Sequence, residues 1–196
     1  MILLAGAVGY LIGSVPTAVL LGRLRGVDLR TEGSGNPGTS NALRTAGWGL
    51  ASAVLAVEAA KGYLAVMGGE WMADDAAAIA GGLGAVAGNV YNMWYRFEGG
   101  KGLGISLGVL AGLWPLVLLP VAVVISVGMR LSGSSGVAAL ATMSALVVMA
   151  MLWWAYSWPT GGIRPTGQLM VVAIGIAVII FRKHWRDAPF TAPARR

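Results

Sequence analysis

The residues best able to do chemistry in this sequence lie in one short polar stretch between two apolar runs. It covers 31–44 and reads TEGSGNPGTSNALR. Glycines allow a backbone to turn its N–H groups toward an anion, and hydroxyl, amide and guanidinium groups supply further donors. The candidate residues are Ser34, Gly35, Asn36, Gly38, Thr39, Asn41 and Arg44. Composition alone allows either an ordinary turn-rich loop or an anion site.

A second stretch of the same character, 99–102 (GGKG), separates two later apolar runs. Gly99, Gly100 and Gly102 would present backbone N–H groups at the start of a helix, where the helix dipole favours an anion. Lys101 adds a positive charge. The spacing of a nucleotide-binding P-loop is absent, so ATP hydrolysis is not expected. Taken alone, this motif is also compatible with a basic hairpin.

Other kinds of chemistry have less support in the sequence. The chain contains no cysteine and one histidine, His184, which excludes thiol chemistry and argues against a zinc site. There is no G-x-S-x-G nucleophile elbow, and no carboxylate is clearly placed to complete a Ser-His-Asp triad. We therefore expect no metal and no cofactor, and a site that binds phosphate groups and acts by positioning and electrostatics.

The elements that must position these residues are apolar. Of 196 residues, 57% are hydrophobic and only 11% are charged, whereas a soluble domain has about 25% charged residues. Several apolar runs approach the length that crosses a hydrocarbon core of roughly 30 Å. These features indicate an all-α polytopic integral membrane protein. The expected spans are 2–24, 48–67, 76–94, 103–114, 115–129, 137–156 and 168–181.

The distribution of basic residues decides how many spans there are. The run 103–129 could be one span or two, and Trp114-Pro115 interrupts it. Two spans put every basic residue except Lys61 and Arg164 on the cytoplasmic side, as the positive-inside effect requires. We therefore expect seven transmembrane helices, some short, with the N-terminus outside and the C-terminus cytoplasmic. The net charge of +6 then indicates anionic lipid, and not nucleic acid, as a partner.

We expect one transmembrane domain, 1–196, ending in a basic cytoplasmic tail, 182–196. This topology puts the serine-rich turn 130–136 and the tail on the same face as both glycine-rich stretches. Inside the second span, Glu58 and Lys61 lie one helical turn apart. Ionisable groups within a membrane indicate function by default, and an internal ion pair that joins helices is the alternative.

The glycine-rich stretches carry a specific resemblance. Residues 34–41, with Arg44 three residues on, resemble the first signature of the bacterial acyl-phosphate:glycerol-3-phosphate acyltransferases, the PlsY family. Residues 9–16 are similar to the family's first helix, 58–62 (EAAKG) stand where the family has Asp-x-x-Lys-Gly, and 88–102 resemble its second signature. The match covers 1–186 in order. The chain departs from the family's patterns mainly at Asn89, where His is usual, at Asn92 and Glu98, and over 182–187.

The resemblance implies a seven-helix enzyme of the bacterial inner (plasma) membrane with its active site on the cytoplasmic face. Such an enzyme transfers a fatty acyl group from acyl phosphate to the 1-hydroxyl of sn-glycerol 3-phosphate, and it releases phosphate and lysophosphatidic acid. This is the first step of phospholipid synthesis. The expected partners are acyl phosphate, glycerol 3-phosphate and membrane lipid, and a substrate phosphate oxygen is the expected general base.

The resemblance also implies roles for individual residues. Ser34, Arg44 and Lys101 are the expected catalytic residues. The 99–102 turn with 34–36 would hold the acyl phosphate, and Arg44 with Asn41 would bind glycerol 3-phosphate. The full set of expected substrate-binding residues is Gly35, Asn36, Gly38, Thr39, Asn41, Gly99, Gly100, Gly102, Ser134, Arg182 and His184. Two alternatives remain open, namely a non-catalytic or altered-acceptor relative that binds lipid phosphates, and a small anion transporter.

Overall fold

The computed structural model describes residues 1–161 and 166–188, with only the backbone of Thr166, and within these ranges every regular element is helical. Short 3₁₀ turns, η1 (Met93–Tyr95), η2 (Pro115–Val117) and η3 (Thr166–Gln168), interrupt the chain. The α-helices are α1 (Ile2–Ser14), α2 (Thr17–Leu24), α3 (Thr39–Met72), α4 (Asp75–Val90), α5 (Leu103–Leu113), α6 (Leu118–Ser132), α7 (Ser135–Tyr156) and α8 (Leu169–Trp185).

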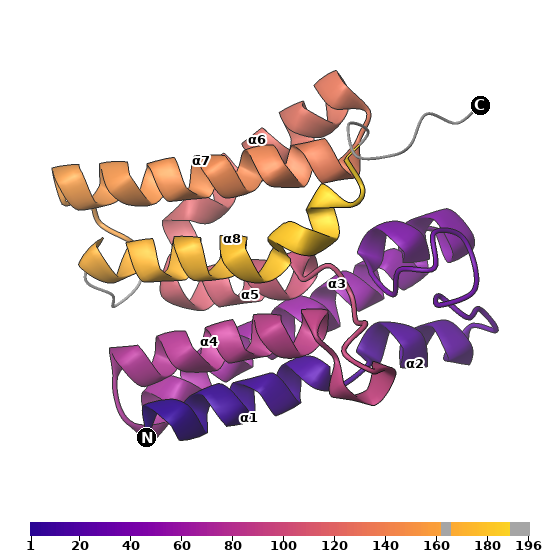
Figure 1. The fold of residues 1–196 in the computed structure, drawn as a ribbon, viewed down its shortest axis with the longest axis horizontal. Helices are drawn as coiled ribbons and strands as arrows, with labels where there is room; N and C mark the ends of the chain where they lie inside the picture. Colours follow the sequence, from indigo (N-terminus) through magenta and orange to yellow (C-terminus); the bar gives the residue numbers. More distant parts are fainter. Residues whose placement is uncertain (162–165, 189–196) are drawn as a thin grey trace. The chain divides into compact units, whose positions relative to one another are not determined.

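The chain forms two compact units, Met1–Gly112 and Leu113–Arg196. In the first unit α4 lies alongside both α1 and α3, and the short α2 packs on α3 (Figure 1). In the second unit α7 packs against α6 on one side and α8 on the other. Both glycine-rich stretches belong to the first unit, so this unit decides whether they meet.

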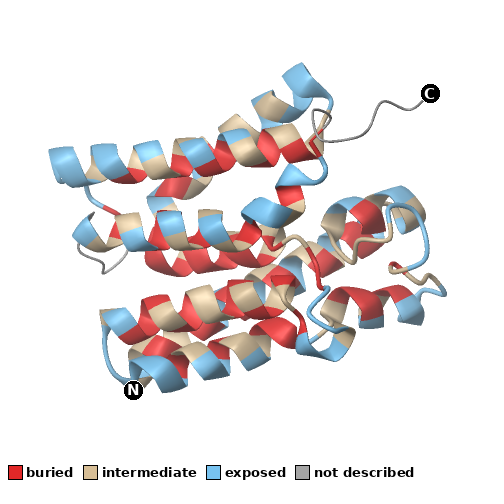
Figure 2. Ribbon diagram, viewed as in Figure 1, coloured by how far each residue is buried: buried red, intermediate tan, exposed pale blue. Residues whose placement is uncertain are grey.

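Glycines allow α1 and α4 to pack backbone against backbone. A Cβ atom added at Gly9 or Gly13 of α1 would overlap a carbonyl group of α4, and one at Gly84 or Gly88 of α4 would overlap a carbonyl of α1. Both helices carry buried residues, and those of α4 lie at its contacts with α3 and α5 as well as with α1 (Figure 2). Small residues at four-residue spacing are the usual means of close helix contact in lipid, where no hydrophobic effect drives helices together.

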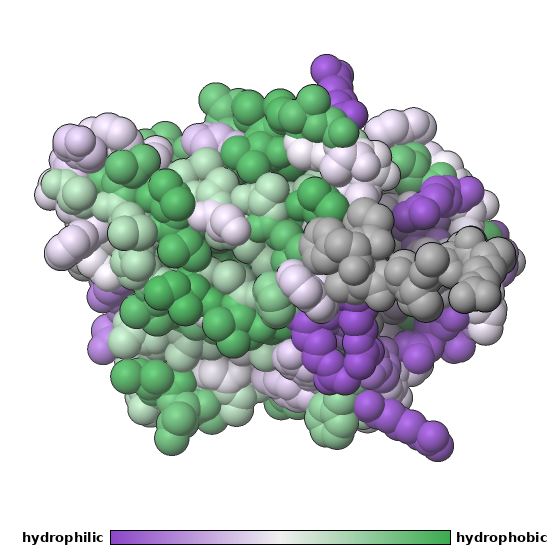
Figure 3. Space-filling view, turned by 45° about the horizontal axis from the view of Figure 1, so that its top comes forward, coloured by the Kyte–Doolittle hydropathy of each residue, from purple (hydrophilic) through white to green (hydrophobic). Residues whose placement is uncertain are grey.

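The outer faces of many helices are apolar, as expected for a protein that contacts lipid. Leu3, Leu131 and Val178 are 90%, 83% and 69% exposed, and hydrophobic side chains cover much of the visible surface (Figure 3). Four helical stretches of the described chain are long and apolar enough to cross a membrane: Ile2–Leu24, Thr39–Met72, Pro115–Ser132 and Ser135–Tyr156. The prediction of an all-α polytopic membrane protein is confirmed at this level.

The structure divides one expected span and extends another. The span 2–24 is two helices that separate at Val15 and Pro16, because proline cannot donate the hydrogen bond that a continuous helix needs there. The run 103–129 is also divided, at Trp114-Pro115, as the sequence predicts. The span expected at 48–67 begins much earlier, at Thr39, and Gly47 interrupts it with φ +76° and ψ −171°, a conformation that only glycine adopts easily.

The predicted polar stretches are shorter than the sequence suggested. The loop expected at 31–44 ends at Gly38, and Thr39, Asn41 and Arg44 lie on the first turns of α3. The turn expected at 130–136 is only Gly133 and Ser134. The tail is helical as far as Trp185, because 182–185 contain neither proline nor glycine to end α8. The sequence also predicts on which side of the membrane three further arginines lie. These fall outside the described residues: Arg164, Arg195 and Arg196.

Candidate functional site

One buried side chain, Asn41, shapes the loop between α2 and α3. It is 1% exposed. Its Oδ1 accepts a hydrogen bond from the N–H of Ser34 at 2.7 Å, and its Nδ2 donates to the carbonyl oxygens of Leu29 at 3.0 Å and Glu32 at 2.9 Å. These bonds use both amide hydrogens and the amide oxygen. The geometry therefore gives Asn41 the role of holding the loop, and its expected contact with glycerol 3-phosphate stays a prediction.

The backbone conformation and the close packing of this loop explain its glycines. Gly33 and Gly35 have φ +62° and +69°, in the left-handed region that favours glycine. A Cβ at Gly33 would also overlap Oδ1 of Asn41. Gly38 precedes α3, so the loop delivers the chain to Thr39 at the positive end of the helix dipole. The first stretch thus combines a rigid turn with a helix N-terminus, as an anion site requires.

The second loop, 91–102, folds back on the end of α4. The N–H of Gly99 donates to the carbonyl of Val90 and the N–H of Gly100 donates to the carbonyl of Asn89, both at 3.0 Å. The sequence predicted that these glycines would offer their N–H groups to an anion, but hydrogen bonds within the chain already use these two. Gly102, at φ +80°, turns the chain into α5, and Lys101 beside it is partly exposed.

The two loops meet in the first unit. The Nη1 of Arg30 donates to the carbonyl of Glu98 at 3.2 Å, and its guanidinium carbon lies 4.0 Å from the centre of the Tyr95 ring. A Cβ at Gly100 would lie 3.3 Å from the carbonyl oxygen of Pro37, so the two turns are in close contact. One pocket is lined by both loops, and its walls include Pro37, Gly99 and Gly100.

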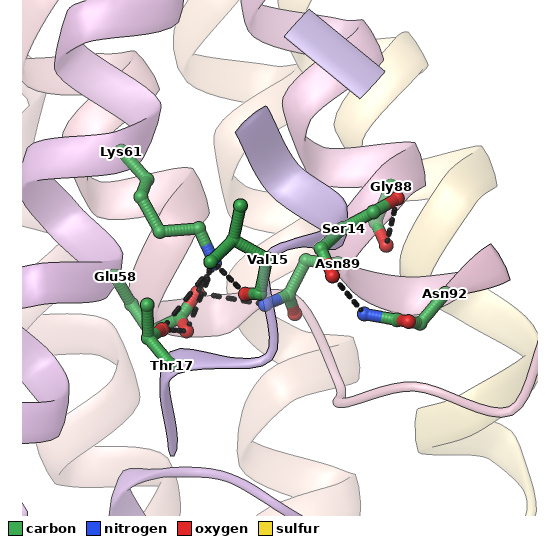
Figure 4. Close-up of polar contacts among 8 residues, drawn as sticks. All are labelled: Ser14, Val15, Thr17, Glu58, Lys61, Gly88, Asn89 and Asn92. Atoms are coloured by element: carbon green, nitrogen blue, oxygen red, sulfur yellow. Dashed lines mark hydrogen bonds and ion pairs between the residues drawn. The ribbon is translucent and has the colours of Figure 1, made fainter. Parts of the chain in front are cut away.

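A buried polar network adjoins this pocket, and Glu58 and Asn89 of the network belong to the pocket lining (Figure 4). Glu58 and Lys61 pair within α3, with 3.1 and 3.2 Å from Lys61 Nζ to the two carboxylate oxygens. Lys61 also donates to the carbonyl of Val15 at 2.7 Å, and Thr17 donates to Glu58. The Nδ2 of Asn89 donates to Glu58 Oε2 at 2.7 Å. The predicted internal ion pair is present, and it joins the α1–α2 break, α3 and α4.

The remaining predicted residues of the first unit lie around these loops. Ser34 is exposed on the first loop, with its N–H bonded to Asn41. Arg44 is exposed on α3, and its Nε donates to the carbonyl of Ser40 at 3.3 Å. Asn36 and Thr39 are partly exposed on either side of Gly38.

Three predicted residues lie in the second unit. Ser134 precedes α7, and its Oγ accepts a hydrogen bond from the N–H of Val137 at 3.4 Å, so this serine caps the helix. Arg182 and His184 lie in the last turn of α8, where Arg182 is exposed and His184 is fully buried. The neighbouring serine, Ser135, is the first residue of α7.

Sequence reasoning missed the residues that join distant parts of the chain. Arg30 and Glu98 are 68 positions apart, and nothing near either residue marks the contact. Asn92 was noted only as a departure from a family pattern, yet its Nδ2 donates to the carbonyl of Ser14 at 2.7 Å and so caps α1. The available signal was general: polar residues beside a helix break in a membrane protein must satisfy backbone groups that no water reaches.

The fold and the pocket define a class of protein, an all-helical integral membrane protein with a polar, glycine-lined site between its helices. A family model described as glycerol-3-phosphate acyltransferase matches residues 3–189. The chain therefore belongs to the glycerol-3-phosphate acyltransferase family.

Individual relatives and solved structures agree with this assignment. A glycerol-3-phosphate acyltransferase of Mesorhizobium japonicum is 37% identical over 185 residues, which are 93% of this chain and 88% of that protein. One of Myxococcus xanthus is 41% identical over 167 residues, with 74% and 87% covered. PlsY, described as an integral membrane glycerol 3-phosphate acyltransferase, has been solved in a glycerol 3-phosphate form. It is 26% identical with a TM-score of 0.76 over 94% of this chain and 88% of that one. Its lysophosphatidic acid form gives a TM-score of 0.75 at the same identity over 93% and 87%.

Proposed function

We propose that this protein transfers a fatty acyl group from acyl phosphate to the 1-hydroxyl of sn-glycerol 3-phosphate and so makes lysophosphatidic acid and phosphate. The observation that carries the proposal is the meeting of the loops 31–38 and 91–102 at one pocket, in a chain of this family. A reaction between two phosphorylated substrates needs two places for phosphate groups. A lipidic donor needs a site within reach of the membrane.

The chemistry requires little covalent help from the protein. Acyl phosphate is a mixed anhydride and is already activated. The oxygen of the 1-hydroxyl attacks the acyl carbonyl carbon and forms the ester bond, while the bond from that carbon to the phosphate oxygen breaks. Phosphate leaves with the electron pair, and the hydroxyl proton passes to a substrate phosphate oxygen. Positioning and stabilisation of the leaving charge are then the main tasks of the site.

The residues divide this work between the two loops. Ser34, Gly35 and Asn36 of the first loop, with Lys101 and Gly102 of the second, would hold the acyl phosphate and the charge on the departing phosphate. Arg44, with Gly38 and Thr39 at the N-terminus of α3, would bind glycerol 3-phosphate. Gly99 and Gly100 would shape the pocket wall, and Asn41 would act by holding the first loop. Ser134, Arg182 and His184 of the second unit stay predicted substrate-binding residues.

We infer the membrane arrangement from length and charge. Seven apolar segments would cross a bacterial inner membrane, with the N-terminus outside and the C-terminus cytoplasmic. They are α1 with α2, α3, α4, α5, η2 with α6, α7 and α8. Of these, α4, α5 and α8 are short, at 16, 11 and 17 residues. Eleven helical residues rise only about 17 Å, so α5 would cross within protein or in a thinned bilayer. Residues 1–196 would act as one transmembrane acyltransferase domain with the active site on the cytoplasmic face.

A product assay tests the proposal directly. The purified protein in lipid nanodiscs is given acyl phosphate and labelled glycerol 3-phosphate, and labelled lysophosphatidic acid is measured. The doubly substituted variant Arg44→Ala, Lys101→Ala should lose at least ~100-fold in rate, since charge-stabilising donors are typically worth that much each. Arg23→Ala is a control that removes one positive charge at an exposed position outside the proposed site. Its 3.8 Å pair with Asp28 is exposed, so the rate should stay near that of the wild type.

The outcomes separate the alternatives. Wild-type product no higher than that of the Arg44→Ala, Lys101→Ala variant would remove the acyltransferase assignment. Consumption of acyl phosphate without labelled product would indicate a different acceptor. Uptake of glycerol 3-phosphate into sealed proteoliposomes without acyl phosphate would indicate a transporter instead.

A further inference from the structure

We propose that Glu58, Lys61 and Asn89 form a positioning unit for the catalytic loops. In this unit a charge-balanced carboxylate holds Asn89, and Asn89 fixes the turn at Gly99 and Gly100 against the first loop. The inference rests on the proposed function. It concerns residues that lie beneath the substrate groups, so none of the three is a catalytic residue.

Asn89 contacts both the ion pair and the turn at Gly99 and Gly100. Glu58 Oε2 accepts from Asn89 Nδ2 at 2.7 Å, which fixes the orientation of the Asn89 amide. The amide oxygen then faces Gly100, because a Cβ on that glycine would lie 3.0 Å from Asn89 Oδ1. The backbone carbonyl of Asn89 accepts from the N–H of Gly100. Asn89 therefore bonds to the second loop through its backbone carbonyl, and its side chain lies against the same turn.

The same turn contacts the first loop. Gly100 approaches the carbonyl oxygen of Pro37, and Glu58, Asn89, Pro37 and Gly100 all line one pocket. A shift of the Asn89 amide would therefore change the separation of the two loops. That separation sets the distance between the proposed phosphate sites, and a displacement of about 1 Å can cost roughly 100-fold in rate.

Charge balance explains why an ion pair is used here. Glu58 is 6% exposed and Lys61 is 7% exposed, so neither charge is well solvated. An unpaired carboxylate in the wall of the pocket would repel phosphorylated substrates. Lys61, at 3.1 and 3.2 Å from its two oxygens, cancels that charge and leaves Glu58 free to accept from Asn89 and Thr17.

The competing explanation is that the network only satisfies the broken first helix. Lys61 and Asn92 do cap the carbonyls of Val15 and Ser14. Asn89 makes no such bond to the helix end, and its side chain connects Glu58 with the catalytic turn. Asn89 is therefore the residue whose substitution distinguishes positioning from capping.

The test measures activity and loop geometry in the same set of variants. Because the chain has no cysteine, spin labels can be placed only at Ser40→Cys and Phe97→Cys. Both positions are exposed, Ser40 on the first turn of α3 directly after the first loop and Phe97 within the second loop. The backgrounds are wild type, Asn89→Leu, Asn89→His and Ser14→Ala. Ser14→Ala removes a buried 3.3 Å hydrogen bond to Gly88 at the same helix contact but does not line the pocket.

We expect Asn89→Leu to broaden the distance distribution between the labels and to lower kcat/KM about tenfold or more, as loss of a bond to a charged group does. Asn89→His keeps a donor for Glu58 and should retain the narrow distribution, and so should Ser14→Ala. An unchanged distribution in Asn89→Leu would overturn the proposal, and so would equal broadening in Ser14→Ala. Because the distances do not depend on turnover, an inactive wild type would refute the function without deciding the positioning.

Two further variants test whether Lys61 is needed to balance the charge of Glu58. Lys61→Met leaves the carboxylate uncompensated, so KM for glycerol 3-phosphate should rise by about tenfold or more. The double variant Glu58→Gln, Lys61→Met is neutral and keeps an acceptor for Asn89, so it should recover most of that loss. A double variant with a KM as high as that of Lys61→Met would contradict the charge-balance argument.

Discussion

At the scale of single residues, the candidate site depends on side chains that hold its two loops. Asn41 satisfies three backbone groups of the first loop, and Arg30 joins that loop to the second. Their identities can be read from the sequence, but their partners cannot. An asparagine on the first turn of a helix has the same local pattern whether it binds a ligand or a loop.

The first prediction concerns Asn41. Asn41→Ala should leave the N–H of Ser34 and the carbonyl of Leu29 without their partner, and it should remove one of the two hydrogen bonds to the carbonyl of Glu32. We expect this loss to lower the free energy of unfolding by about 2 kcal/mol. Tryptophan fluorescence during thermal unfolding in detergent would measure this. The control is Ser40→Ala. It removes an exposed hydroxyl group that makes no hydrogen bond to the loop in the described part of the chain. Equal melting temperatures for the two variants would contradict a role of Asn41 in holding the loop.

A second prediction tests the contact between the loops. Arg30→Lys keeps the charge but loses the planar guanidinium that lies over Tyr95 and donates to Glu98. The variant should lose about tenfold in kcat/KM, with little change in melting temperature, because both loops are at the surface. Arg25→Lys makes the same substitution nearby on an exposed side chain. An equal loss of kcat/KM in Arg25→Lys would show that the effect does not depend on the contact of Arg30 with Tyr95 and Glu98.

At the scale of elements, glycines decide which helices touch. Besides α1 and α4, the helices α3 and α5 meet through Gly62 and Gly108, where a Cβ atom would overlap a carbonyl of the other helix. The sequence shows that the chain is rich in glycine and that close packing is expected. It does not show which glycines face a helix, because glycines on both sides of a helix look alike.

The adjacent pair Gly68 and Gly69 of α3 makes this testable. A Cβ at Gly69 would overlap the carbonyl of Ala77 on α4, whereas Gly68 has nothing within 4 Å. Gly69→Ala should cost about 1–3 kcal/mol through forced separation of the helices. Gly68→Ala should gain roughly 0.5–1 kcal/mol, because alanine loses less backbone entropy. Thermal unfolding would show whether each variant is less or more stable than the wild type. A change of stability in the same direction in both variants would contradict the packing argument.

The bend in α3 gives a prediction of the same kind. Gly47→Ala forces a side chain into a glycine-only conformation and should destabilise the protein by ~2 kcal/mol. Gly49→Ala, two residues on, meets nothing within 4 Å and should be neutral or slightly stabilising. If Gly47→Ala melted no lower than Gly49→Ala, the bend would not need glycine.

At the scale of the whole molecule, much of the fold can be predicted from the sequence. Apolar runs located the helices to within a few residues in most cases, and Trp114-Pro115 correctly divided one run. The errors arose where polar residues continue a helix, as at 39–46 and 182–185, because hydropathy alone cannot distinguish a polar helix from a loop. The two glycine-rich stretches that the sequence singles out do meet in the structure. The Asn89–Glu58 contact could not be predicted, since it depends on how two helices pack.

The proposed topology predicts labelling by a membrane-impermeant thiol reagent. Ala73→Cys, exposed between α3 and α4, should react from outside the cell. Ser40→Cys and Ser132→Cys, both exposed, should react only after the membrane is opened. Reaction of Ala73→Cys and Ser132→Cys from the same side would refute the arrangement of seven spans.

The ion pair also bears on how the protein is made. Glu58 and Lys61 lie three residues apart on one helix, so their charges can neutralise each other before any other helix exists. A lone charge at the centre of a nascent membrane helix costs about 2.5–3.5 kcal/mol during insertion. Because α3 carries its own counter-ion, it can leave the translocon as soon as it is synthesised, and it can wait in the bilayer until α4 arrives with Asn89.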